Sequence, residues 1–545
     1  MKATRITCLW LASAAALAAQ NATVENAALY QASTEYFIYP NSASVFFDPA
    51  VFLTTTPNII SPRMLAVLIY PVTGTALPPL HPVSATLYLR PVGSSTLIPV
   101  NVSSAIQGAV TFVVPSYAPP GGAELLYQID SGPTEWTTVN VVQSSFAFFR
   151  TGTGGPAIAQ ALSSTGASST VGLATPIQPG QTLLLTGSGL GYGTTVTATI
   201  GGLSAPVIYA GPSGTAPAGN DRIQLQVPQS VTPGCYVPVT VTLNSITQTT
   251  TISATADGSP CQHPWQLSVN DLKTLDSGGY LIDAPINLET DLSVVTSTAG
   301  SRNESASMYL STISGARLAG YFQPSPVPSG CISLTPANGV FAAAEFLGGD
   351  INSVFSPPPI PDIGSTVTLQ SPTTAIQLTG LDGYFAAQNL PPPVDGPLSN
   401  LPVPAIAGGK WTFQSSGGAD LPASSFGFTL PAPVQLTGGV PVMMNHTQAQ
   451  TVSWNGAAFD AGATAGISLQ GSGVISCTAP ASAGTVTIPA ALLSGFSANT
   501  IGTLTISISE AGANVPHAQF QTKNGNTLLF FVPFSSSDAR PVFFQ

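Results

Sequence analysis

Charge is what this 545-residue sequence has least of. Asp, Glu, Lys and Arg make up 6% of the residues, against about 25% in an average soluble domain. The few charges are mostly acidic, and the formal net charge is −11 at pH 7. Binding to phosphate backbones or to anionic membranes requires clustered Lys and Arg. We therefore expect no nucleic-acid partner and no attraction to an anionic membrane.

Long apolar runs and helical periodicity are scarce too. Beyond the N-terminus no run of about 18 apolar residues occurs, so no membrane span is expected there. Short β-branched runs recur instead between Gly, Pro, Asn or Ser, for example at 84–90, 195–200 and 502–508. Such turn-punctuated alternation predicts an all-β chain, and its length requires more than one β-sandwich.

The N-terminus has the pattern of an export signal. Lys2 and Arg5 precede an apolar stretch from Ile6 to Leu17, and small residues surround a cleavage site near Ala18. We predict a signal peptide at residues 1–18 and an exported protein that is secreted or held at the cell surface. Loss of this leader leaves 10 basic and 23 acidic residues, a net charge of −13.

Cysteine is the next scarce residue, with four copies beyond the leader. An even number in an exported chain suggests disulfides. Cys235 and Cys261 bracket one expected hairpin whose ends return to one sandwich edge, so we predict that pair. Closing this loop could stabilise the fold by roughly 3 kcal/mol. Cys331 with Cys477 follows only by elimination, and two buried thiols are the alternative.

One phrase, Val-Pro followed by four residues and Pro-Gly, occurs twice. It begins at Val114 and again at Val227, an offset of 113 residues. This offset is the size of one immunoglobulin-like sandwich, and each copy lies between two strand-like segments. The fold class predicted for the chain is therefore all-β, with tandem immunoglobulin-like β-sandwich domains.

Composition suggests where the domains begin and end. A Gly-rich join at 151–155 and a Pro-rich run at 357–361 mark two of the boundaries. After the signal peptide we expect these regions: an immunoglobulin-like sandwich at 22–150, a second at 160–262, an irregular β-rich region with a Pro-rich connector at 263–360, a sandwich at 361–431 and a C-terminal sandwich at 432–545.

Residues 177–256 have a recognisable order of motifs. They are Ile177-Gln-Pro-Gly180, an apolar strand, Thr186-Gly-Ser-Gly-Leu-Gly191, Ile200-Gly-Gly, Pro206-Val-Ile-Tyr-Ala-Gly211 and the second copy of the repeated phrase. This order resembles an IPT/TIG-type immunoglobulin-like domain of the kind found in large exported soil-bacterial proteins. A weaker repeat covers 30–150, which lacks the Gly-rich turn and the cysteines.

The C-terminal half also resembles the region C-terminal to such domains in those proteins. Its marks are Ser329-Gly-Cys331, Asp362-Ile-Gly364, Ser416-Gly-Gly-Ala-Asp420 and Ile475-Ser-Cys477. The resemblance attaches no catalytic role to these motifs.

The glycines and histidines of this sequence do not match the motifs that bind nucleotide cofactors or metals. The glycines from Gly187 to Gly193 lack the Rossmann spacing, because Tyr192 stands where a glycine is needed, and no helix follows. We interpret them as a turn between strands. The four histidines are scattered without ligand spacing, so we expect no metal and no cofactor; they are His81, His263, His446 and His517.

Acidic residues cluster modestly in the region 263–360: Asp271, Asp276, Asp283, Glu289, Asp291, Glu345 and Asp350. Paired carboxylates hydrolyse glycosides, and with carbonyl oxygens they hold calcium. We favour solvated loop acids and keep structural calcium and a catalytic pair as alternatives. Four tryptophans could stack on sugar rings, but their strand-like contexts favour core packing; they are Trp136, Trp265, Trp411 and Trp454.

Together these observations predict an exported, non-enzymatic, multi-domain protein that acts as an extracellular scaffold, adhesion or interaction module. Its partners would be proteins or polysaccharides outside the cell. The first alternative is a glycan-binding protein, which requires exposed aromatic side chains on one face of one domain. The second is a secreted hydrolase that uses the acids of region 263–360.

Overall fold

The computed structural model describes most of the chain between residues 23 and 545. The described ranges are 23–26, 59–69, 82–106, 109–151, 155–163, 165–192, 195–214, 219–244, 246–296, 299–322, 330–334, 361–381, 384–387, 406–438, 442–456, 459, 463–509 and 512–545. The predicted signal peptide, His81, Glu345, Asp350 and the Pro-rich connector before residue 361 lie outside them.

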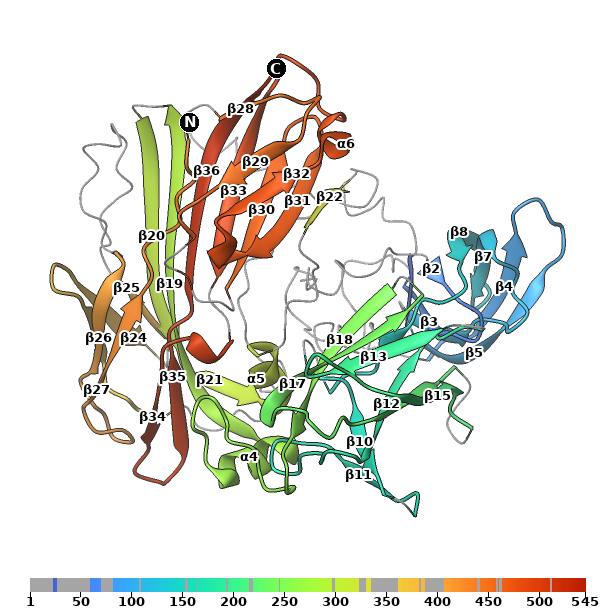
Figure 1. Cartoon of the computed structure of the whole chain (residues 1–545), viewed down its shortest axis with the longest axis horizontal. Helices are drawn as coiled ribbons and strands as arrows, with labels where there is room; N and C mark the ends of the chain where they lie inside the picture. The colour runs from blue at the N-terminus through green and yellow to red at the C-terminus, as the bar shows by residue number, and fades with distance from the viewer. Residues whose placement is uncertain are drawn as a thin grey trace. The chain divides into compact units, whose positions relative to one another are not determined.

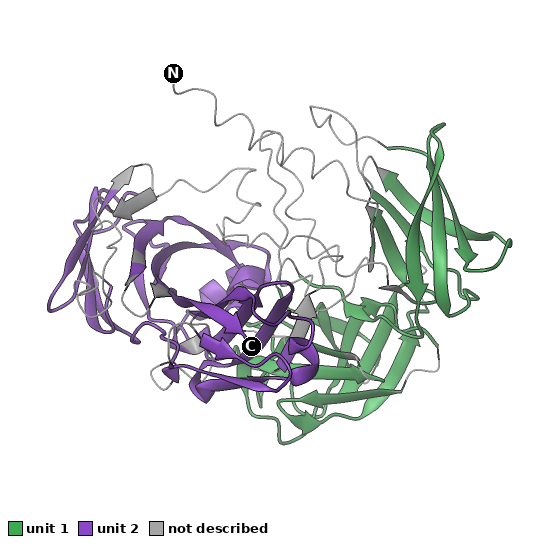
Figure 2. Ribbon diagram, turned by 90° about the horizontal axis from the view of Figure 1, so that it is seen from above, with its two compact units in different colours: residues 1–261 green, residues 262–545 purple. Residues whose placement is uncertain are grey.

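The chain is all-β and divides into two compact units, residues 1–261 and 262–545 (Figure 2). Strands supply almost all the regular structure of the described residues (Figure 1). The first unit holds two sandwiches in tandem, each with its own apolar core. The prediction of an all-β chain with tandem immunoglobulin-like domains is confirmed.

The first sandwich contains β1 (Thr23–Asn26), β2 (Ile59–Ile60), β3 (Leu65–Ile69), β4 (Ala85–Pro91), β5 (Ile98–Ile106), β6 (Ala109–Val113), β7 (Gly121–Ile129) and β8 (Thr134–Val141). Their order is β1-β3-β6-β5-β4-β7-β8-β2, and β5 pairs with both β6 and β4. Alternate side chains of the strands on either side of β5 fill one core, for example Phe112 of β6 and Leu125 of β7. The sheet therefore folds over at β5 into two layers.

The second sandwich contains β9 (Ala147–Phe148), β10 (Ala159–Leu162), β11 (Ser168–Thr170), β12 (Thr182–Ser188), β13 (Val196–Ile200), β14 (Leu203–Ser204), β15 (Val207–Pro212), β16 (Asp221–Gln226), β17 (Gly234–Leu243) and β18 (Ile246–Ala254). One sheet has the order β11-β10-β12-β16-β15, and the other has β14-β13-β17-β18. Taken in chain order, these are the A-B-E-D and C′-C-F-G sheets of an immunoglobulin fold.

The repeated phrase occupies the same place in both sandwiches. It connects β6 to β7 in the first and β16 to β17 in the second, which are the equivalent crossings from one sheet to the other. Val114 and Val227 are both 1% exposed. The N–H of Ala118 donates to the carbonyl of Pro115 over 3.1 Å, and Val231 donates to Pro228 over 3.3 Å. The repeat therefore encodes an inter-sheet turn.

The second unit has one extended strand order, β22-β31-β30-β33-β36-β19-β20-β25-β24-β23-β26-β27, with shorter strands attached. Its elements are α4 (Val269–Asp276), β19 (Tyr280–Thr296), β20 (Ala299–Tyr309), β21 (Ser311–Ser314), α5 (Gly315–Gly320), β22 (Gly330–Leu334), β23 (Thr366–Gln370), β24 (Ala375–Leu381), β25 (Tyr384–Ala387), β26 (Gly409–Ser415), β27 (Ser424–Leu430), β28 (Val442–Met444), β29 (Gln450–Ser453), β30 (Thr464–Gln470), β31 (Val474–Pro480), β32 (Thr485–Ile488), α6 (Ala490–Leu493), β33 (Ile501–Ser509), β34 (His517–Gln521), β35 (Thr527–Phe531), β36 (Phe534–Phe544) and the 3₁₀ turns Ala481–Ala483 and Gly512–Asn514.

The region 263–360, expected to be irregular, supplies the longest hairpin of this unit. Figure 1 shows β19 and β20 as a long pair of strands beside β36, and β36 pairs with β19 in parallel. One core cluster runs through this hairpin and through the sheets on both sides of it. Strands of the predicted domains 361–431 and 432–545 thus share one hydrogen-bonded sheet with β19 and β20.

Candidate binding face and its supporting sites

The outward face of the first sandwich carries an exposed row of apolar side chains. Across the neighbouring strands β5, β4, β7 and β8, Pro99 lies opposite Tyr88, Tyr88 opposite Leu126, and Leu126 opposite Trp136. Trp136 is 59% exposed and Tyr88 is 37% exposed. Their neighbours along the strands, such as Leu87 and Leu89, point into the core. We call Pro99, Tyr88, Leu126 and Trp136 the aromatic row.

Polar rows flank the aromatic row on both sides. The row on one side lies two residues from the aromatic row along each strand and consists of Asn101, Thr86, Gln128 and Thr134. In the other direction it is Arg90, Glu124 and Thr138, and Leu97, two residues before Pro99, is an exposed apolar exception. Nε of Arg90 donates to the Glu124 carboxylate over 2.7 Å, so the two charges of this face neutralise each other. The face offers neutral hydroxyl and amide groups around a narrow apolar stripe.

The prediction that all four tryptophans pack in cores is wrong for one of them. Trp265, Trp411 and Trp454 are at most 4% exposed, whereas Trp136 faces solvent. The reason lies in the phase of β8, where Thr137, Val139 and Val141 take the inward positions. Tyr88 was not among the sequence candidates, although the alternation of Leu87 and Leu89 around it places it on the outward side.

An ion pair joins the two sandwiches of the first unit. Arg63 donates to the Asp221 carboxylate over 2.7 Å, and Asp221 is 1% exposed. The Leu190 N–H donates to the other oxygen of this carboxylate over 2.8 Å. Burial raises the pKa of Asp221, while the Leu190 hydrogen bond and the Arg63 charge oppose that shift. Arg63 also lies 5.0 Å from the Tyr192 ring centroid, so its guanidinium is held from two sides.

Arg63 occupies a backbone position that glycine takes in the second sandwich. Its φ is 66° and its N–H donates to the Val114 carbonyl; the φ of Gly180 is 79° and its N–H donates to the equivalent Val227 carbonyl. A left-handed conformation costs a non-glycine residue roughly 1–2 kcal/mol. The ion pair with Asp221 explains why an arginine stands here.

The Gly-rich turn packs against residues 143–147, which join the two sandwiches, as the interpretation of a strand turn allows. Gly189 and Gly191 have φ values of 93° and 69°, while Gly187 lies in the extended strand β12. A Cβ on Gly191 would overlap the Gln143 carbonyl, and one on Gly187 would overlap the Ala147 carbonyl. Here glycine permits a close approach of backbones rather than a phosphate contact.

The join between the sandwiches differs from the expected one. Ala147 and Phe148 form β9, which pairs with Ser188 and Gly187 of β12. Phe146 and Phe148 are each 1% exposed and belong to the core of the second sandwich. This apolar segment was expected to close the first domain before the Gly-rich join. Its aromatic side chains find their core on the other side of that boundary.

The acids of region 263–360 lie apart in different structural roles. Asp271 forms the capping box of α4 with Ser268, and Asp276 is exposed at the end of that helix. Glu289 and Asp291 share the outward phase of β19, and each accepts a hydrogen bond, from Ser305 over 3.2 Å and from Ser537 over 2.5 Å. Most of these acids therefore sit on a helix or strand rather than in loops.

Asp283 is fully buried among polar partners. Ser311 donates to one carboxylate oxygen over 2.5 Å, and Nη1 of Arg317 lies 3.9 Å from the other. The guanidinium also donates to the Tyr309 hydroxyl over 3.3 Å. Burial raises the pKa of nearby Tyr321 to about 12. This cluster fixes β19 against β21 and α5.

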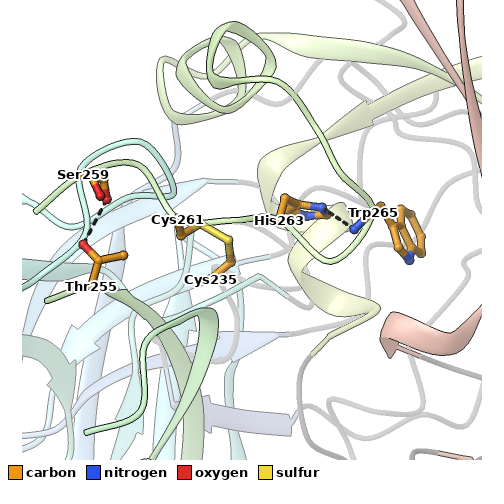
Figure 3. Close-up of a disulfide and its surroundings, with 6 residues drawn as sticks. All are labelled: Cys235, Thr255, Ser259, Cys261, His263 and Trp265. Carbon is orange, nitrogen blue, oxygen red and sulfur yellow. Dashed lines mark hydrogen bonds between the residues drawn. A yellow bond between two sulfur atoms is a disulfide. The ribbon is translucent and has the colours of Figure 1, made fainter.

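Two histidines meet at one tryptophan. The His517 ring stacks 5.4 Å from the Trp265 ring, and the His263 ring lies 6.3 Å from it. Nδ1 of His263 accepts the backbone N–H of Trp265 over 3.0 Å (Figure 3). Burial and the charge of His517 lower the pKa of His263 to about 3. In the described part of the chain, no three His, Cys, Asp or Glu side chains group as metal ligands do.

The cysteines form two pairs at disulfide distance. Cys235 at the start of β17 bonds to Cys261, with Cα atoms 5.3 Å apart (Figure 3). Cys331 and Cys477 lie directly opposite each other on β22 and β31, with Cα atoms 4.0 Å apart.

The sequence motifs of the C-terminal half also converge. The Asp362 carboxylate accepts the N–H groups of Gly364 and Ala419 over 2.9 and 2.8 Å, and Asp420 accepts the Asp362 N–H over 2.8 Å. These backbone hydrogen bonds lower the pKa of Asp362. The motifs at 362–364 and 416–420 therefore form one turn structure.

The fold and the strand order define a multi-domain β protein with immunoglobulin-like sandwiches. No family model matches the chain, and no curated protein does. None of the helices in the described ranges is long and apolar enough to span a membrane.

Among solved structures, similarity is low. The Dpr2 Ig1–Ig2 complex with DIP-Theta Ig1–Ig3 is 11% identical, with a TM-score of 0.13; the match covers 37% of this chain and 61% of that one. The titin I9–I11 tandem is 9% identical, with a TM-score of 0.10 and coverages of 66% and 95%. SGBP-B of Bacteroides ovatus, solved with a mixed-linkage heptasaccharide, is 9% identical, with a TM-score of 0.13 and coverages of 75% and 84%.

Proposed function

We propose that this chain is an exported, non-catalytic interaction protein of the IPT/TIG-type group. Its tandem immunoglobulin-like sandwiches act as a stiff support that presents one sheet face to a partner outside the cell. The signal-peptide pattern at residues 1–18 and the two cysteine pairs support export. The Arg63–Asp221 ion pair and the close approach of Gly191 to the Gln143 carbonyl support the stiffness.

One observation carries the proposal: the aromatic row is in register and exposed on a regular sheet face. Large apolar side chains grouped on a surface mark a binding site more often than single ones do. Residues on adjacent strands keep the row in place, because the β4–β7 and β7–β8 ladders run through it without a register shift.

The test is retention of the full chain on its own cell surface material, separated into a polysaccharide and a protein fraction. Trp136→Ala is compared with Tyr117→Ala, since Tyr117 is 66% exposed but lies in the connection between β6 and β7. We expect one fraction to retain the wild type and the Tyr117 variant, but to lose the Trp136 variant. Equal retention of all three, or of none, would contradict the proposal.

The hydrolase alternative has its best candidates in Glu289 and Asp291, because they lie two residues apart on one face of β19. Each is held by a serine. We expect no release of reducing ends from a polysaccharide panel by the wild type. Hydrolysis that disappears in Glu289→Gln or Asp291→Asn would establish the alternative in place of our proposal.

A further inference from the structure

We propose that the aromatic row binds a neutral, extended polysaccharide, with sugar rings stacked on Trp136 and Tyr88. This inference rests on the proposed function and names the ligand for the same face. The aromatic row is one residue wide and four strands long. Its shape therefore matches a linear ligand that lies across the strands.

The spacing of the two rings supports a chain of sugars. Tyr88 and Trp136 lie on strands that flank β7, with Leu126 between them. Strands in a sheet are about 4.8 Å apart, so the two aromatic side chains are spaced by roughly 10 Å. That is about the length of two consecutive rings of an extended polysaccharide, which places an intervening ring over Leu126.

The chemistry of the face also fits a neutral sugar. An aromatic ring has a negative face, which attracts the C–H groups on the flat side of a sugar ring. The hydroxyl and amide groups of Thr86, Gln128 and Thr138 lie where they can hydrogen-bond to sugar hydroxyls at the ring edges. Arg90 and Glu124 pair with each other, so no net charge favours an ionic ligand.

The same dimensions argue against a protein partner. A stable protein interface buries about 800 Å² on each side and has a core of fully buried apolar side chains. The aromatic row holds four apolar side chains in single file, and the rows beside it are polar except for the exposed Leu97, two residues before Pro99. A polysaccharide needs no wider apolar strip than the one present.

The experiment is affinity gel electrophoresis of the full chain in gels that contain barley β-glucan, xyloglucan, galactomannan or soluble starch, with polygalacturonate as a charged control. We expect retardation by at least one neutral polysaccharide and none by polygalacturonate. Trp136→Ala and Tyr88→Ala should each weaken binding about tenfold, which corresponds to 1.4 kcal/mol. Trp136→Phe should retain part of the affinity, and Tyr117→Ala all of it.

Fluorescence gives a second readout, because a glycan that covers Trp136 should shift the emission to shorter wavelengths, whereas unfolding exposes the buried tryptophans and shifts it to longer wavelengths. Of the four tryptophans in the described residues, Trp136 is the exposed one, so a bound glycan should shift and quench its emission. The inference fails if no neutral polysaccharide binds, or if binding survives in Trp136→Ala and Tyr88→Ala. Should a protein fraction instead be retained in a Trp136-dependent way, the proposed function stands and the glycan assignment falls.

Discussion

Buried charge has a structural cost in any protein, and three buried carboxylates of the described residues each lie beside an arginine. Asp221 has Arg63, Asp538 has Arg540 and Asp283 has Arg317. Removal of one member leaves the other charge buried and uncompensated. At this scale, Asp283 of region 263–360 acts as a structural group.

Replacement of Asp283 by alanine should lower the free energy of unfolding by about 3–5 kcal/mol, the usual cost of breaking a buried pair. Asp276→Ala is the matched control, because Asp276 is exposed at the end of α4. We expect the control to change stability by less than about 0.5 kcal/mol. Urea unfolding curves measure both, and similar midpoints would show that the Asp283 cluster contributes little.

His263 should make stability depend on pH. Its folded pKa of about 3 lies below the unfolded value of 6.5, so between these values the unfolded state binds the proton and the folded state does not. Stability therefore rises with pH across this window and falls on acidification. His263→Gln should flatten this dependence, as denaturant midpoints between pH 7 and pH 4 will show, and an equally steep dependence in this variant would contradict the prediction.

At the scale of strands and turns, the repeated Val-Pro phrase is a local signal that the structure bears out, and Gly201-Gly202 of the quoted motif order form a turn. Both glycines have positive φ between β13 and β14, as a tight hairpin requires. The long strand β19 was not predicted, because Asp283 and Pro285 interrupt its apolar pattern. Their environment is set by Arg317 and by neighbouring strands, which a single stretch of sequence does not contain.

The candidate site was only partly predictable, because it too depends on pairing between strands that are distant in the sequence. Trp136 was a candidate from its residue type, but its exposure depends on the phase of β8. The alignment of Tyr88 with Trp136 depends on the register of β4, β7 and β8. Register arises from long-range pairing, so no local pattern reveals it.

Two glycines of similar φ should lose different amounts of stability when replaced by alanine, because only one of them lies at the joint between the sandwiches. Gly202 has a φ of 78° and open space around its Cα, whereas a Cβ on Gly191 would meet the Gln143 carbonyl. Gly202→Ala should lower the free energy of unfolding by about 1–2 kcal/mol, the cost of a left-handed backbone for a residue with a Cβ. Gly191→Ala should cost more and should open the segment 142–151 to proteases. Equal cleavage of both variants would show that the glycine contact does not hold the joint.

At the scale of the whole chain, two separate units should respond independently to local damage. Replacement of Cys235 and Cys261 together by serine should destabilise the first unit by about 3 kcal/mol. Trp265, Trp411 and Trp454 are buried in the second unit, so their emission should report an unchanged transition. Far-ultraviolet circular dichroism follows both units. A parallel shift of both signals would indicate that the units unfold together.

The strand β9 has a consequence for where this chain can be cut or recombined. A fragment that starts at residue 160, as sequence composition suggests, omits Phe146 and Phe148 and leaves a hole in its own interior. The smallest portable version of the second sandwich starts near residue 142 and ends at Cys261. Fused to another protein, the longer fragment keeps Phe146 and Phe148 and completes its own core. The shorter fragment would need apolar side chains from its fusion partner to fill the same space.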